Sequence, residues 1–86
     1  MFWVRWEEMA LNELTTSWTE ADSALRQLIT AAAHQIDQQL QSDPYGCGES
    51  RTEGRRIHFI YPLGLLYRVE EDEQTVSVLH VWRFGR

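Results

Sequence analysis

The chain has 86 residues, 43% of them hydrophobic, and a formal net charge of −5. This length suits a single domain with one modest core. An acidic whole argues against strong non-specific binding of nucleic acid, but it leaves room for a local phosphate site.

A few residue counts narrow the cellular setting. The one cysteine, Cys47, cannot close an intramolecular disulfide. No signal peptide is visible, and no apolar run approaches the ~20 residues of a membrane span. We therefore expect a cytoplasmic protein without membrane contact. No spacing of histidine, cysteine and carboxylate resembles a metal site, so we expect no metal and no other cofactor.

The first half of the chain predicts a short strand and two helices. Residues 2–6, FWVRW, alternate loosely and favour a strand. A helical stripe then follows and ends near Trp18; its members are Ala10, Leu11, Leu14 and Trp18. Thr19 is the predicted N-cap of a second helix. That helix ends at residues 42–44, and its stripe is Leu25, Leu28, Ile29, Ala32, Ala33, Ile36 and Leu40.

The second half predicts three strands. Residues 43–50, DPYGCGES, form a loop by composition, and residues 56–61 then alternate with a period of two. A turn at residues 62–64 leads to a strand over 65–70, and EEDEQ forms the next turn. Residues 75–81 are apolar and β-branched on both faces, which is typical of a central strand.

The predicted fold class is α+β, with residues 1–86 forming one domain. Its order is strand, two-helix hairpin, then a three-stranded antiparallel meander, with both helices on one face of the sheet. The N-terminal strand should join the edge of the sheet. The predicted core face holds Ile57, Phe59, Tyr61, Leu65, Tyr67 and Val69. The open face would then carry Arg56, His58, Leu66 and Arg68.

A cluster of charge on the predicted open face suggests a phosphate site. All eight basic residues of the chain are arginines, and the stretch ESRTEGRRIHF holds Arg51, Arg55 and Arg56 beside His58. Arg68 can join them from the next strand because neighbouring strands lie ~4.8 Å apart. The pattern does not fix the facing of the remaining candidates, Arg51, Arg55, His80 and Arg83. A solvated strand edge is the other interpretation of this stretch.

The four tryptophans have two interpretations. They could be stacking platforms for RNA, but in a small domain they more simply supply core and rim area. The run of acids at residues 70–73 is interpreted as a solvated turn.

The order of elements and several short motifs resemble the RelE/ParE superfamily of bacterial type II toxin–antitoxin toxins, which includes plasmid-stabilisation proteins. The motifs are ALNEL in the first helix, IDQQLQSDP at the end of the second, then GESR, PLGLLYRV and VSVLHVWR. The resemblance covers nearly the whole chain. It implies a helix hairpin packed on a small sheet and a cognate antitoxin that wraps the toxin.

The resemblance implies one of two activities. RelE-like members are ribosome-dependent endoribonucleases that bind RNA on the open sheet face. There a base helps the 2′-hydroxyl attack the adjacent phosphate while cations stabilise the crowded phosphate. ParE-like members inhibit DNA gyrase. By this resemblance Arg51 and Arg56 match basic positions of the ribonuclease branch. The branch's next arginine corresponds to Gly64 or Leu65, and Arg68 could substitute for it.

The leading hypothesis is a toxin that cuts mRNA on the ribosome without a metal. Its phosphate-binding candidates are Arg51, Arg55, Arg56 and Arg83, and its catalytic candidates are His58, His80, Arg56 and Arg68. The alternatives are a ParE-like gyrase inhibitor, a decayed toxin that only binds its antitoxin, and a small module that forms a dimer. The acidic charge and Gly64 favour a non-enzymatic binder.

Overall fold

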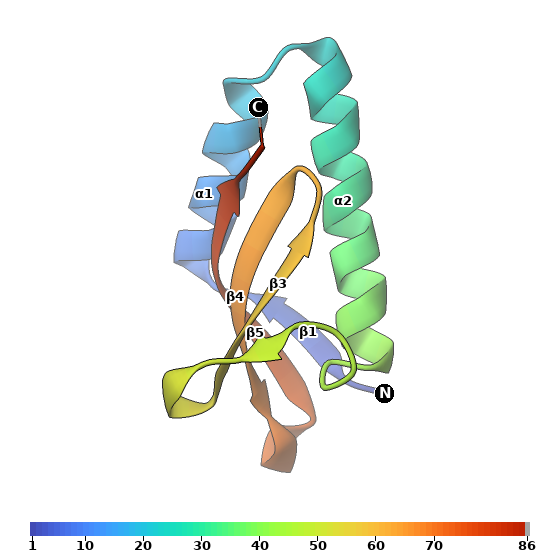
Figure 1. The fold of residues 1–86 in the computed structure, drawn as a ribbon, viewed down its shortest axis with the longest axis vertical. Helices are drawn as coiled ribbons and strands as arrows, with labels where there is room; N and C mark the ends of the chain where they lie inside the picture. Colours follow the sequence, from blue (N-terminus) through green and yellow to red (C-terminus); the bar gives the residue numbers. More distant parts are fainter. Residues whose placement is uncertain (86) are drawn as a thin grey trace.

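The computed structural model describes residues 1–85 as a two-helix layer on one five-stranded sheet. The strands are β1 (Trp3–Trp6), β2 (Glu49–Ser50), β3 (Arg55–Ile60), β4 (Leu63–Glu70) and β5 (Thr75–Arg83). Their order in the sheet is β1-β5-β4-β3-β2. The predicted meander of β3, β4 and β5 is confirmed, and β1 joins the edge as expected. Because β1 runs parallel to β5, the sheet is mixed (Figure 1).

The two helices form the predicted hairpin, α1 (Glu8–Thr19) and α2 (Ser23–Ser42) (Figure 1). The predicted N-cap at Thr19 is wrong, because Thr19 is the last residue of α1. Asp22 caps α2 instead, and its carboxylate accepts the backbone N–H of Leu25 at 2.9 Å. This bond satisfies one of the free donors of the first helical turn. The helix ends before Pro44, where it was expected to end.

The core lies between the helices and one face of the sheet. α1 packs along β5, whereas α2 crosses β1, β3 and β4. The helical stripes supply their expected core residues apart from Leu11, Trp18 and Leu28, which are exposed. The buried apolar side chains are Ala10, Ala21, Ile29, Ala32, Ile36, Leu40, Leu63, Leu65, Tyr67, Val76, Val78 and Val81. β5 is the predicted central strand, since it pairs with both β1 and β4.

The predicted facing of β3 is wrong by one residue, and the turn explains the error. A three-residue turn over 62–64 would pair Tyr61 with Leu65. The observed turn has only two residues, Tyr61 and Pro62, so Ile60 pairs with Leu63. A slip of one residue moves every side chain of a strand to the other face. The odd-numbered side chains of β3 therefore share the open face with the even-numbered side chains of β4.

This slip exchanges the two predicted sets on β3. Arg56 and His58 face the α2 side of the sheet, where the core was expected to hold Ile57, Phe59 and Tyr61. Phe59 and Tyr61 are about half exposed instead. On β4 the prediction is right, with Leu65 and Tyr67 buried.

No helix within residues 1–85 combines the length and the apolar character that crossing a bilayer requires.

Candidate functional site: an arginine-lined depression

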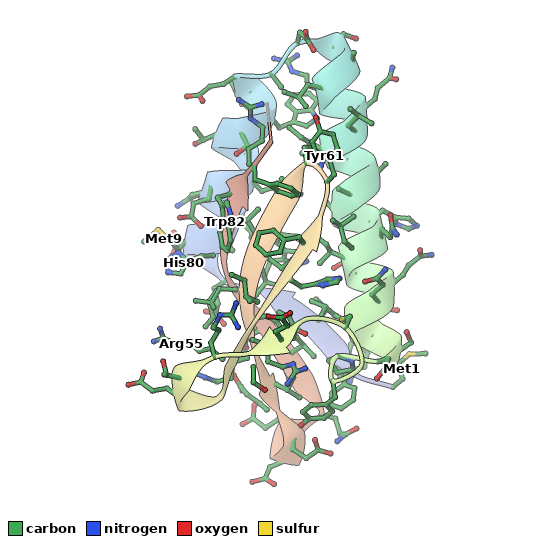
Figure 2. All side chains as sticks on the ribbon, in the orientation of Figure 1. Met1, Met9, Arg55, Tyr61, His80 and Trp82 are labelled. Atoms are coloured by element: carbon green, nitrogen blue, oxygen red, sulfur yellow. The ribbon has the colours of Figure 1, made fainter. Side chains whose placement is uncertain are left out.

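A depression of about 430 Å³ lies on the open face of the sheet. Four strands contribute to it, and α1 approaches its rim. It is lined by Arg5, Glu7, Arg55, Leu66, Arg68, Glu70, Leu79 and His80. We call this the arginine depression. Figure 2 labels two of its members, Arg55 close to the β2 end of the sheet and His80 on the side of α1.

Arg55 and Arg68 form the cationic centre of the arginine depression. They are directly paired across β3 and β4, so their side chains leave the same face. The Nε of Arg55 is buried and has no hydrogen-bond partner among residues 1–85. Arg68 takes part in none of the ion pairs found within those residues. Arg55 has one ion pair, with Glu53 at 3.7 Å from its Nη2. Two adjacent guanidinium groups with donors to spare are suited to binding a phosphate or a carboxylate.

Arg5 differs from this pair because acids already neutralise it. Its Nε lies 3.1 Å from a carboxylate oxygen of Glu7, and its Nη2 lies 3.8 Å from one of Glu70. Ser77 connects the two sides, since Arg5 donates to its hydroxyl at 3.0 Å and that hydroxyl donates to Glu70 at 2.9 Å. The arginine depression therefore has a compensated cation at the β1 edge. Between β3 and β4, Arg55 has one weak ion pair, with Glu53 at 3.7 Å from its Nη2, and Arg68 has none among residues 1–85.

His80 stands at the rim of the depression, held by a carboxylate from α1. Glu13 accepts the backbone N–H of Val81 at 2.9 Å through one oxygen and lies 3.3 Å from Nδ1 of His80 through the other. With the proton on Nδ1, that nitrogen donates to Glu13 and Nε2 is left as a proton acceptor. Such an arrangement can orient a histidine for proton transfer.

Sequence reasoning missed Glu13, and the geometry of β5 shows why. β5 has an irregularity beside the Leu66–His80 pair, where Leu79 is the extra residue. Bulges redirect side chains and leave backbone groups unpaired. The free N–H of Val81 is what fixes Glu13, and neither the bulge nor this bond has a signature in the spacing of the residues.

Arg56 is outside the arginine depression, contrary to the predicted facing. Its guanidinium donates to the carbonyl of Tyr45 at 2.9 Å, the hydroxyl of Ser50 at 2.9 Å and the carbonyl of Gly48 at 3.3 Å. Its Nε also reaches the hydroxyl of Tyr67 at 3.4 Å. These bonds tie the loop after α2 to β3 and leave the side chain few free donors.

Tyr67 completes this tie from the core. Its hydroxyl is within 2.7 Å of the carbonyl of Pro44 and 2.8 Å of that of Cys47. Burial raises the pKa of Tyr67 to about 12, so the hydroxyl stays protonated and can donate to these carbonyls. Arg56 and Tyr67 together shape the loop that was predicted from composition alone.

His58 is also outside the depression, again contrary to the predicted facing. Its Nε2 lies 2.8 Å from the side-chain oxygen of Gln39 on α2. Burial lowers the pKa of His58, which favours the neutral ring. A neutral histidine with one nitrogen engaged by an amide is suited to joining β3 to α2.

The other two predicted phosphate ligands are separate from the cluster. Arg51 lies in the loop beyond β2 and contacts its own neighbours, the carbonyl of Ser50 at 2.9 Å and Glu49 at 3.5 Å. Arg83 lines a different groove, formed with α1 residues that include Asn12 and Thr16. The structure thus brings together Arg55, Arg68 and His80 from the predicted set.

Gly64 has a packing reason for being a glycine. A Cβ at this position would lie 2.6 Å from atoms of the Trp82 indole. The indole therefore lies against the backbone of β4, in space that any side chain would occupy. Among residues 1–85 no group of three or more histidine, cysteine or acidic side chains could hold a metal ion.

Comparisons with known proteins place the fold. No model of a known protein family matches the sequence, and no curated protein matches it. Among solved structures, the RelBE2 toxin–antitoxin complex of Mycobacterium tuberculosis aligns with a TM-score of 0.78 at 22% identity, covering 99% of this chain and 93% of that one.

Two further structures widen the comparison. The chromosomal ParDE system of P. aeruginosa aligns with a TM-score of 0.76 at 16% identity, covering 99% of this chain and 98% of that one. The isolated RelE toxin of E. coli aligns at 0.65 and 17% identity, covering 100% and 87%. The chain therefore has the RelE/ParE fold that the motifs predicted. Since structures of both branches share it, the fold does not choose between their activities.

Proposed function

We propose that the chain is the toxin of a type II toxin–antitoxin pair and that it cleaves mRNA in the arginine depression. The observation that carries this proposal is the pair Arg55 and Arg68 beside a histidine that Glu13 orients. Within residues 1–85 the pair has one ion pair, from Arg55 to the exposed Glu53 at 3.7 Å. Cations for a phosphate and a group for proton transfer thus line one depression. The fold shared with toxin–antitoxin structures supports the same role.

The chemistry follows from the positions of these groups. The guanidinium groups of Arg55 and Arg68 bind the non-bridging oxygens and stabilise the added charge of the crowded phosphorus. Nε2 of His80 takes the proton of the 2′-hydroxyl, while Glu13 holds the ring and stabilises its charged form. The O2′–P bond forms, the P–O5′ bond breaks, and O5′ takes a proton from solvent. These steps require no metal ion.

The net charge bears on how RNA reaches the site. A chain with a charge of −5 attracts free RNA weakly, because long-range steering depends on the overall field. A ribosome that holds mRNA in place would supply the missing local concentration. We therefore include ribosome dependence and a cognate antitoxin in the proposal.

Gyrase inhibition is the second candidate. The ParDE alignment covers both chains almost completely, and Gly64 stands where the ribonuclease branch commonly has an arginine. In this case the arginine depression would bind an acidic protein surface instead of RNA.

Controlled expression tests the proposal. Growth, the integrity of cellular mRNA and gyrase supercoiling would be measured for wild type, Arg68→Ala and Arg83→Ala. The last is the matched control, because it removes the same charge from a groove outside the depression. We expect growth arrest with cut mRNA, a loss of cleavage of at least about a hundredfold in Arg68→Ala, and near wild-type cleavage in Arg83→Ala.

Other outcomes select other functions. Arrest with intact mRNA and blocked gyrase would establish the second candidate. No arrest from folded protein would indicate a decayed toxin. Glu13→Gln keeps an acceptor for the N–H of Val81 but removes the charge beside His80, so it should lower cleavage less than His80→Gln does and change its pH profile.

A further inference from the structure

Four aromatic rings form an exposed ladder at the hairpin end of the sheet. Phe59 makes edge-to-face contacts with Trp82 and Phe84, at centroid distances of 6.0 and 5.2 Å. Tyr61 meets Phe84 in the same way at 5.7 Å. We call Phe59, Tyr61, Trp82 and Phe84 the aromatic shelf. Phe59 and Tyr61 remain 49% and 53% exposed, so the ladder is not core material.

The aromatic shelf shares a face with the arginine depression. Arg55 and Phe59 are four residues apart on β3, and both side chains leave the open face. On a strand this spacing corresponds to roughly 13 Å. In Figure 2, Tyr61 lies at the tip of the β3–β4 hairpin and Arg55 toward the other end of the sheet. A ligand that extends along β3 can therefore contact both features.

The backbone around the aromatic shelf fits the rings closely. Gly64 lets the indole of Trp82 lie against β4, and Gly85 passes so close to Tyr61 that a Cβ would lie 2.8 Å from its ring. The rings are thus held in place by the backbone and by one another. Rigid, exposed aromatic faces are suited to stacking because little conformational entropy is lost on binding.

The neighbouring charge indicates what covers the aromatic shelf. Exposed aromatic groups alone fit a protein partner as well as a nucleic acid. Here, however, the shelf continues into Arg55 and Arg68. Arg68 has no acidic partner among residues 1–85, and that of Arg55 is the exposed Glu53, which precedes β3 and lies 3.7 Å from its Nη2. Aromatic platforms beside a cationic groove are the usual means of binding single-stranded nucleic acid, because rings stack on bases while cations follow the phosphates.

We propose that the aromatic shelf stacks a base of a single-stranded RNA whose phosphate lies between Arg55 and Arg68. This inference rests on the proposed function and adds a base-binding subsite to it. Stacking accepts any base, because every base has a flat π-face. The subsite would therefore position the strand without reading its sequence.

Two probes separate base contacts from phosphate contacts. One is a single-stranded oligoribonucleotide of about six nucleotides, and the other is an abasic ribose-phosphate oligomer of the same length. Affinity would be measured by fluorescence anisotropy at fixed low salt. We expect wild type to prefer the first probe by roughly tenfold. Phe59→Leu, which keeps apolar bulk, should remove most of that preference and leave the abasic probe's affinity unchanged.

Matched variants control the measurement. Trp18→Leu changes an exposed aromatic residue on the helix hairpin and should leave both affinities unchanged. Arg68→Ala should lower the affinity for both probes by similar factors. Tyr61→Leu, in the exposed turn, is a second shelf variant in case Phe59→Leu does not fold, which thermal melting would reveal.

Each other result overturns the subsite. Equal affinity of wild type for the two probes, no binding of either, or an unchanged preference in both folded shelf variants excludes base stacking. A shelf without base preference would instead be a protein contact. Cleavage that depends on Arg68 but not on the shelf would leave the proposed function standing. Absence of both binding and cleavage would end both proposals.

Discussion

Arg55 and Arg56 are neighbours in the chain, but their side chains leave opposite faces of β3. Arg55 lines the arginine depression with a buried Nε that has no partner among residues 1–85. Arg56 donates to two backbone carbonyls and a hydroxyl of the loop after α2. The first is available to a ligand, whereas the second is committed to holding the loop.

This difference predicts a separation of stability from function. Arg56→Ala should lower the free energy of unfolding by about 1–3 kcal/mol, because it leaves loop carbonyls without their charged donor. Arg55→Ala should change it by less than about 0.5 kcal/mol and reduce RNA cleavage instead. Urea denaturation checks both values. Equal losses of stability would contradict the assignment of Arg56 to the loop.

His58 should make stability depend on pH. Burial lowers its pKa in the folded chain, while the unfolded value is about 6.5. Between these two values the unfolded chain binds more protons, so this contribution is complete above about pH 6.5 and is lost as pH falls toward the folded pKa.

The matched variants are two histidine substitutions. His58→Gln should flatten the loss of unfolding free energy between about pH 7 and 5.5, whereas His34→Gln, at an exposed position of α2, should not. Denaturation at a series of pH values measures the slopes. A slope unchanged by His58→Gln would show that other groups cause it.

At the scale of elements, the β3–β4 hairpin decides what the open face carries. A turn of two residues sets the register, and Gly64 then faces Phe59 across the strands. By the resemblance, Gly64 is a position that could correspond to an arginine of the ribonuclease branch. Here its backbone lies directly beneath the indole of Trp82. The hairpin thus has rings near its turn and guanidinium groups toward its other end.

Gly64→Ala tests this packing. The new Cβ would meet the indole at 2.6 Å, so Trp82 must move, and we expect a loss of about 1–3 kcal/mol of unfolding free energy. In a Trp82→Leu background the same substitution should cost clearly less, since the rigid neighbour is gone. Urea denaturation of the four proteins gives the coupling. An equal cost in both backgrounds would exclude the indole as the obstacle.

Periodicity predicted the elements themselves, and local geometry accounts for what it missed. The helical stripes, the alternation along β1, β3 and β4 and the apolar, β-branched run of β5 were enough for the meander, the edge position of β1 and the helix layer. The face on which Arg56 and His58 lie depends on whether the β3–β4 turn has two or three residues, and composition does not fix that length. Glu13 depended on a bulge in β5. Arg68 was placed correctly because β4 alternates cleanly into the core.

At the scale of the whole molecule, charge is divided between the two halves of the chain. Residues 1–43, which include both helices, hold seven acids and two arginines. The later strands hold Arg55 and Arg68 of the depression, and Arg5 comes from β1. An RNA strand would thus be drawn to one face only, while the helix layer suits a partner with basic groups. In the proposed function, substrate and antitoxin would therefore contact different surfaces of the chain.

The carboxylates that pair with Arg5 compete with any phosphate that enters the arginine depression. Glu7 and Glu70 already form ion pairs with Arg5 at the β1 edge. A phosphate that enters the depression must therefore displace a carboxylate before it can bind Arg5. Their negative charge also repels a second phosphate. In the proposed function, the site would therefore hold one phosphate at Arg55 and Arg68, and the acids at the β1 edge would repel a second one there. For an enzyme, that limited grip favours release of the cut strand and so the next turnover.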